Sequence, residues 1–161
     1  MYFVLSGVDK PRYLGYVAWR GITHDYPTEK VFTCASFGRG ASVGLFPVIG
    51  DRVYWWFTEN VLEKDLEEFE KKMTLKLSPE ECQSRIVSFL QKKRWFPESM
   101  DIVQKCVPQS IIFNPIYDRL PLPTPWGWDC VTLLGDAAHP TSPILGQVYC
   151  SIACCFTSKV Y

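Results

Sequence analysis

The chain has 161 residues, of which 47% are hydrophobic and 15% aromatic, enough to bury one core of ordinary size. Its 17 lysine and arginine residues balance its 17 aspartate and glutamate residues, so charge gives no reason to expect a nucleic acid or an acidic membrane as partner. No run of about 18 apolar residues occurs, and we therefore expect no transmembrane segment. No targeting segment is visible either.

Four segments in the first third of the chain predict an antiparallel sheet, because they are rich in β-branched and aromatic residues and are separated by Gly, Pro and Asp. They are residues 13–22, 30–37, 41–48 and 52–58. Gly50-Asp51 lies between the last two and predicts a tight hairpin turn. Alternation along residues 52–58 puts Tyr54 and Trp56 on one face and Trp55 and Phe57 on the other. Since both faces are apolar, we expect both to be covered.

Helices should follow the sheet. The charged run 61–72 is interpreted as a solvated helix or a loop. Residues 78–95 predict a helix more strongly, because Ser78 can act as N-cap, Pro79 occupies the first turn and Glu81 completes a capping box. Downstream, the pattern predicts a short helix, a strand, an irregular proline-rich segment and a last strand, at residues 98–106, 110–119, 120–128 and 130–134.

The seven cysteines are scattered and odd in number, which favours reduced thiols over a disulfide framework. Cys150, Cys154 and Cys155 form a cluster that could contribute to a zinc site. Such a site needs four suitably spaced ligands, and the sequence offers only this one cluster. Zinc binding is therefore the weakest of the functional hypotheses.

The string LLGDAAHPTSPILGQ, at residues 133–147, has the layout of a ligand site. Asp136 follows a predicted buried strand, where its carboxylate could accept hydrogen bonds from the hydroxyls of a sugar-like chain. Gly135 permits close approach of a ligand, and Pro143 restricts the following turn. A helix beginning near Gly146 and Gln147 would direct free N–H groups at negative charge on a ligand.

This string resembles the second FAD-binding motif of para-hydroxybenzoate hydroxylase-like flavoprotein monooxygenases, and most closely that of plant zeaxanthin epoxidase-like enzymes and FAD-dependent urate hydroxylases. The segments YVAWRGI, VGLFPV, GDRVYWWF and YDRLPLPTPWG resemble segments that occur in the same order in those enzymes. The resemblance implies an oxidoreductase that reduces FAD with NAD(P)H and transfers one oxygen atom from O2 to a small organic substrate.

The resemblance also implies roles for individual residues. Gly135, Asp136, Pro143, Gly146 and Gln147 would bind the cofactor, with Asp136 at the ribityl and pyrophosphate part of FAD. Arg20 and Tyr54 are candidates for the substrate pocket, whereas no catalytic residue is assigned. His139 lies in the motif and is interpreted as a structural hydrogen-bonding group.

The expected fold class is α+β, with a mostly antiparallel substrate-domain sheet and helices at residues 1–125. Residues 126–161 would supply the C-terminal strand and turn of an FAD-binding α/β domain. The Gly-x-Gly-x-x-Gly segment that opens such enzymes is absent, since Gly38, Gly40 and Gly44 have another spacing. We therefore expect a partial chain that lacks the N-terminal Rossmann half and is inactive alone. The sequence leaves the location unknown, with a soluble protein of the cytoplasm or of the chloroplast as the two alternatives. The alternative is a non-catalytic remnant that acts through protein contacts and self-associates through exposed apolar surface.

Overall fold

The computed structural model of the chain describes residues 11–120, 127–128, 131–133, 135–137, 140 and 142–143. The chain forms two compact units, one of residues Gly15–Pro115 and the other of Met1–Leu14 together with Ile116–Tyr161. Within the described residues, none of the helices has the length and apolar character needed to cross a membrane.

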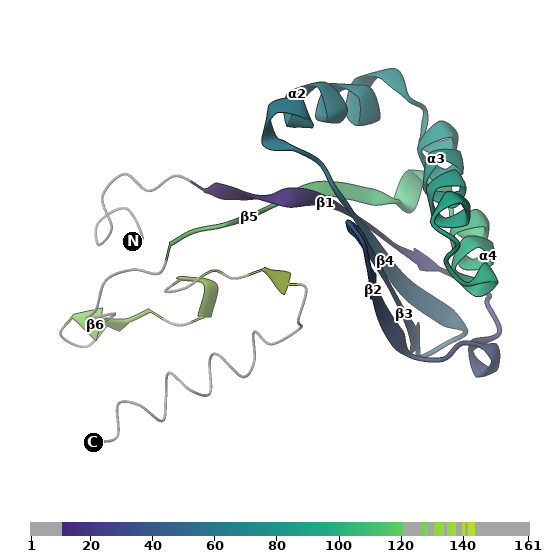
Figure 1. Ribbon diagram of the computed structural model, residues 1–161. Coiled ribbons are helices and arrows are strands. Elements are labelled where there is room, and N and C mark those ends of the chain that lie inside the picture. The colour runs from purple at the N-terminus through teal and green to yellow at the C-terminus, as the bar shows by residue number, and fades with distance from the viewer. Residues whose placement is uncertain are drawn as a thin grey trace. The chain divides into compact units, whose positions relative to one another are not determined.

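A five-stranded sheet is the main element of the fold, with the strand order β2-β3-β4-β1-β5 (Figure 1). The pairs β2–β3, β3–β4 and β4–β1 are antiparallel, which confirms the expected α+β class with a mostly antiparallel sheet. The strands are β1 (Arg12–Thr23), β2 (Cys34–Gly38), β3 (Ala41–Val48), β4 (Arg52–Asn60) and β5 (Ile112–Asp118).

The hairpin between β3 and β4 closes at the predicted Gly50-Asp51 turn. The loop between the paired Val48 and Arg52 has three residues, and the last two have positive φ, 81° for Gly50 and 48° for Asp51. Glycine adopts this conformation without steric cost, and aspartate tolerates it better than most residues. The turn fixes the register, so that Pro47 lies opposite Val53 and Gly44 opposite Trp56.

One predicted strand begins later than expected. Residue Lys30 belongs to the short 3-10 helix η1 (Thr28–Lys30), and β2 starts only at Cys34. Pro27 precedes η1 and has an extended backbone conformation. The N–H groups of Lys30 and Val31 then donate to the carbonyls of Pro27 and Thr28. These local bonds replace the ladder that the β-branched residues predicted.

The helices contribute to a core on one face of the sheet. They are α2 (Glu63–Lys71), continued by the π-helix η2 (Lys72–Lys76), α3 (Pro79–Lys92) and α4 (Pro97–Lys105). Figure 1 shows α3 and α4 side by side. Ile86 and Leu90 of α3 are fully buried with Trp19, Trp55 and Phe57 of the sheet. The charged run near residue 65 is thus a helix that buries mainly Leu66.

The expectation that both faces of the sheet are covered holds for only one of them. Trp55 and Phe57 are at most 1% exposed, whereas Tyr54 and Trp56 on the opposite face remain half-buried. There the aromatic side chains pack against one another, with Phe46 and Tyr54 ring centroids 6.3 Å apart. Apolar composition alone predicted burial, but only the first face receives the helices' apolar residues.

The predicted capping box of α3 is present in full. The Glu81 N–H donates to Ser78 Oγ at 3.2 Å, and the Ser78 N–H donates to Glu81 Oε2 at 2.7 Å. These two bonds satisfy the N–H groups of Ser78 and Glu81, and Pro79 has no N–H group to satisfy.

Replacing Ser78 by alanine should lower the free energy of unfolding by about 1 kcal/mol, because the side-chain acceptor at the N-cap is lost. Urea denaturation followed by circular dichroism measures this difference. Ser84→Ala is the matched control, since Ser84 is exposed within the same helix and its loss should be neutral or slightly stabilising. Equal effects of the two substitutions would contradict a stabilising cap.

A two-stranded ladder occurs near the C-terminal end of the described chain. Gly127–Trp128 (β6) pairs antiparallel with Val131–Thr132 (β7). Residues 120–128 were predicted to be irregular throughout, and this prediction is wrong for the last two. The prolines stop at Pro125, so Gly127 and Trp128 keep the backbone N–H groups that a ladder uses.

Candidate functional site

The glycine–aspartate turn of the motif follows closely after β7. Leu133 is buried at 6% exposure, and residues Gly135–Ala137 form the 3-10 turn η4. Gly135 is buried and has a φ of 53°, the left-handed region in which a side chain would be strained. Because the chain turns there, the next residue, Asp136, is exposed.

The Asp136 carboxylate makes no hydrogen bond or ion pair with any other residue that the structure describes. An exposed carboxylate on a glycine turn can accept hydrogen bonds from hydroxyl groups of a ligand, and Ala137 beside it is exposed and small. These features fit the polyhydroxylated part of a nucleotide cofactor.

The remaining motif residues are only partly within the described chain. Pro143 is exposed, next to the half-buried Ser142. His139, Gly146 and Gln147 lie outside the described residues, as do Cys150, Cys154 and Cys155. Among the residues described, no group of three or more His, Cys, Asp and Glu side chains could hold a metal ion. Cys34, Cys82 and Cys106 are free thiols.

The sheet face opposite the helices, here called the open face, carries the two candidate substrate residues. Arg20 of β1 lies opposite Trp56 of β4, and Ile22 lies opposite Tyr54. Arg20 and Tyr54 are therefore on the same face of neighbouring strands. Arg20 is exposed, and its Nη2 donates to Asn114 Oδ1 of β5 at 3.2 Å.

Two residues of the open face were not predicted as site residues. Asn114 contacts Arg20, and the sequence did not indicate this because the neighbour of β5 in the sheet was unknown. The Trp56 side chain covers Gly44 on the neighbouring strand, because a Cβ at Gly44 would be only 2.3 Å from the indole nitrogen of Trp56. A glycine within a strand often marks such a close approach, and that signal could have identified the pair.

A buried ion pair lies on the helix-covered face. Arg85 Nη2 of α3 is 2.7 Å from Glu59 Oε1 of β4, and the Glu59 side chain is 5% exposed. Burial raises the pKa of the Glu59 carboxyl, and the charge and hydrogen bond of Arg85 offset only part of this rise. Arg85 also lies 4.9 Å from the ring centroid of Phe69. This pair is part of the core and is separate from the open face.

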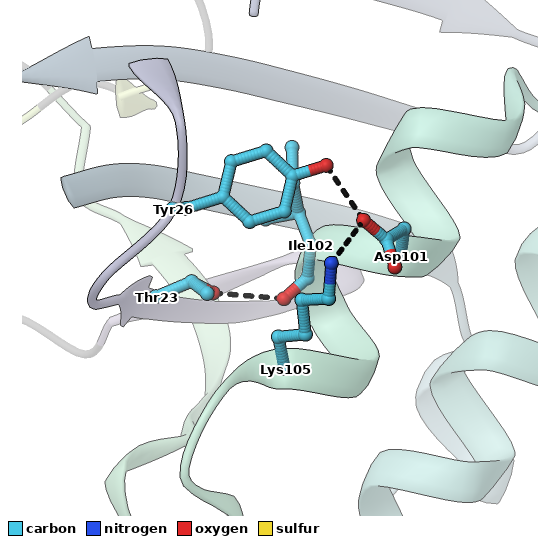
Figure 2. Close-up of polar contacts among 5 residues, drawn as sticks. All are labelled: Thr23, Tyr26, Asp101, Ile102 and Lys105. Atoms are coloured by element: carbon cyan, nitrogen blue, oxygen red, sulfur yellow. Dashed lines mark hydrogen bonds and ion pairs between the residues drawn. The ribbon is translucent and has the colours of Figure 1, made fainter. Parts of the chain in front are cut away.

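A second polar cluster joins the end of β1 and the following loop to α4 (Figure 2). Thr23 Oγ1 donates to the Ile102 carbonyl at 2.8 Å, and the Tyr26 hydroxyl donates to Asp101 Oδ2 at 2.7 Å. Lys105 donates to the same Asp101 oxygen at 2.9 Å. Burial and the hydrogen bond to Asp101 raise the pKa of Tyr26 to about 12, so its hydroxyl remains a donor. We interpret the cluster as structural, because each of its side chains has a partner within the fold.

Two of the grooves lined by described residues contain neither Arg20, Tyr54 nor Asp136. One, of about 480 Å³, is lined by Lys72, Leu77, Glu80, Glu81, Ser84, Arg85 and Ser88. The other, of about 430 Å³, is lined by Lys30, Val31, Phe32, Cys34, Ala35, Ser36, Leu45, Phe96 and Glu98. The first is lined mainly by polar and charged side chains, and the second by a mixture of apolar and polar ones.

Sequence comparison relates the chain to flavoprotein monooxygenases. No family model matches it. It is 28% identical over 142 residues to aurachin C monooxygenase/isomerase of Stigmatella aurantiaca, covering 87% of this chain and 33% of that protein. It is 31% identical over 151 residues to the FAD-dependent urate hydroxylase of Mycolicibacterium vanbaalenii, covering 92% of this chain and 35% of that protein. A chloroplastic zeaxanthin epoxidase of an Oncidium hybrid cultivar is 26% identical over 155 residues, covering 91% of this chain and 21% of that protein.

Solved structures show the same fold. Klebsiella pneumoniae HpxO complexed with FAD and uric acid matches with a TM-score of 0.72 and 24% identity, over 94% of this chain and 36% of that one. PqsL of Pseudomonas aeruginosa matches with a TM-score of 0.63 and 19% identity, over 89% of this chain and 36% of that one. The resemblance inferred from the motif is thereby confirmed. The chain spans about a third of the length of the first two relatives.

Proposed function

We propose that the chain supplies the substrate-binding sheet and part of the FAD site of a monooxygenase of the hydroxylase or epoxidase type, with NAD(P)H as reductant and O2 as oxidant. The observation that carries this proposal is the turn at Gly135, which exposes the Asp136 carboxylate within a flavoprotein-like motif. The relatives named FAD-dependent urate hydroxylase and zeaxanthin epoxidase support it.

We assign substrate binding and FAD binding to two different parts of the sequence. Residues 1–125 would form the substrate-binding part, and residues 126–161 would contribute to the FAD-binding domain. Asp136 would accept hydrogen bonds from hydroxyls of the cofactor, where the buried backbone of Gly135 allows a close approach. Pro143, Gly146 and Gln147 would complete the cofactor contacts.

FAD, when bound, supplies the redox chemistry, and the chain's own residues bind, orient and shield the reactants. The half-buried Tyr54 and Trp56 give the open face an apolar wall that can exclude water from a small organic substrate. Arg20 on the same face can donate hydrogen bonds to that substrate. The 161 residues alone are proposed to be inactive, because a site formed by a third of the relatives' length leaves the flavin open to water.

Replacing Asp136 by alanine should weaken FAD binding by about 1–3 kcal/mol, the range for losing a charge-assisted hydrogen bond. The measurement is a flavin-fluorescence titration of the full protein that carries this chain. Asp65→Ala is the matched control, because Asp65 is also exposed but lies in α2. An Asp136→Ala protein that binds FAD as tightly as the control would refute the proposed role.

A further inference from the structure

The two edge strands of the sheet, β2 and β5, differ in how they are protected. β5 contains Pro115, and its Asp118 pairs with Arg12 at 2.7 Å. Prolines and charged side chains on an edge strand oppose pairing with another chain. β2 has neither, because its sequence is CASFG. Among the described residues β2 pairs with β3 alone, so its other edge is both free and unprotected.

The backbone of β2 presents hydrogen-bonding groups at this free edge. Gly38 pairs with Ala41 across a two-residue turn, and such a closing pair exchanges both of its backbone hydrogen bonds. Alternation then directs the N–H and C=O groups of Ser36 toward β3, and those of Ala35 and Phe37 away from it. A row of donors and acceptors with this spacing matches the backbone of another extended strand.

The side chains beside the free edge leave room for such a strand. Phe37 is 59% exposed and lies on the open face, where its ring centroid is 6.4 Å from that of Trp56. Ala35 is exposed on the same face and has a small side chain. On the opposite face, Ser36 lines the groove of about 430 Å³ that residues at the start of α4 also line. A strand added to β2 would therefore meet an aromatic ring on one face and a groove on the other.

We propose that two copies of this chain associate through β2, with the two strands antiparallel and centred on Ser36. This register places each Ala35 opposite Phe37 of the second copy, so that a small side chain faces a large one on both sides of the two-fold axis. The two Ser36 hydroxyl groups face each other at the axis, where they can form a hydrogen bond. No aspartate, glutamate, lysine or arginine occurs in β2, so like charges do not oppose the pairing.

The proposed interface goes beyond the proposed function and does not depend on it, because it uses neither FAD nor a substrate. It is also small, since β2 has only five residues. We therefore expect a dimer that forms and dissociates with concentration, as small protein interfaces do, and not a permanent one.

Sedimentation velocity of the full protein that carries this chain, over a range of concentrations and without FAD, tests the association. We expect the unchanged protein to shift from monomer to dimer as its concentration rises. Ala35→Lys should raise the dissociation constant about tenfold or more, because it brings two cations close together across the paired strands. Ser88→Lys is the matched control, since Ser88 is also exposed but lies in α3, and it should leave the dissociation constant unchanged.

A disulfide test checks the register. Ser36 faces its own copy as a pair without mutual hydrogen bonds, in which Cα atoms are about 4.5 Å apart, a separation that a disulfide can span. Ser36→Cys should therefore form a disulfide-linked dimer when glutathione disulfide is supplied as oxidant, whereas Ser88→Cys should not. The unchanged protein should not be linked through Cys34, because this register places Cys34 opposite Gly38.

Three results would overturn the proposal. One is an unchanged protein that remains monomeric at every concentration, and another is an equal effect of Ala35→Lys and Ser88→Lys. The third is a Ser36→Cys protein that is linked no more than the Ser88→Cys protein. FAD affinity is measured separately, so none of these results alters the test of Asp136.

Discussion

Trp55→Ala is expected to lower the free energy of unfolding by about 3–5 kcal/mol, the range for removing a large aromatic side chain from a core. Trp55 is 1% exposed and belongs to the core cluster. Its ring also fills the space above Gly21, where a Cβ would be 2.8 Å from Trp55 Cζ2. The cavity left by the substitution cannot be filled without moving strands. Chemical denaturation of both proteins measures the loss.

Trp56→Ala is the matched control, since the two tryptophans are adjacent in sequence and face opposite sides of the sheet. Trp56 is half-buried on the open face, so its removal should cost only about 1–2 kcal/mol. A loss as large as that of Trp55→Ala would show that the open face is as fully packed as the core. It would also contradict the use of this face as a ligand surface.

Arg85→Met should destabilise the protein by about 3–5 kcal/mol near neutral pH, because it leaves the buried Glu59 carboxylate without its partner. Glu59 is only 4% exposed, so water contributes little to stabilising its negative charge. Methionine retains most of the apolar stem that packs near Phe69. The free energy of unfolding is measured by denaturation at several pH values.

The pH dependence of this loss has a definite sign. Burial raises the folded-state pKa of Glu59 above its ordinary value, and Arg85 is the main group that lowers it. Removing Arg85 raises that pKa further, so the folded protein holds a proton that the unfolded chain releases. Stability then falls as pH rises from the unfolded pKa through the folded pKa. The loss caused by Arg85→Met should accordingly be larger at about pH 8 than at about pH 5.

The double variant Glu59→Gln/Arg85→Met controls for lost packing. It has no ionisable group at position 59, so its stability relative to Glu59→Gln should not show this added pH dependence. If the loss in Arg85→Met is the same across the pH range, Glu59 is not the buried charge that Arg85 compensates.

The sequence by itself determined the elements whose signals are local. The Gly50-Asp51 turn, the capping box at Ser78 and the strands at residues 41–48 and 52–58 were predicted because each depends on residues a few positions apart. The motif around Asp136 likewise identified the cofactor class that the relatives support. Local signals misplaced several element boundaries, as at Lys30 in η1, at Ser110 in the 3-10 helix η3 (Pro108–Ser110) and at Gly127 in β6.

The tertiary structure alone decided which surfaces are buried and which distant residues meet. Trp55 and Trp56 are equally apolar, yet only the face of Trp55 receives the helices, because covering a sheet depends on where the chain returns. Arg20 meets Asn114 across 94 positions of sequence, and Arg85 meets Glu59 across 26. Such pairs form when strand order and helix packing close long loops, and no local pattern encodes that closure. The turn at Gly135-Asp136 could thus be read from the sequence, whereas the aromatic open face emerged only from the folded sheet.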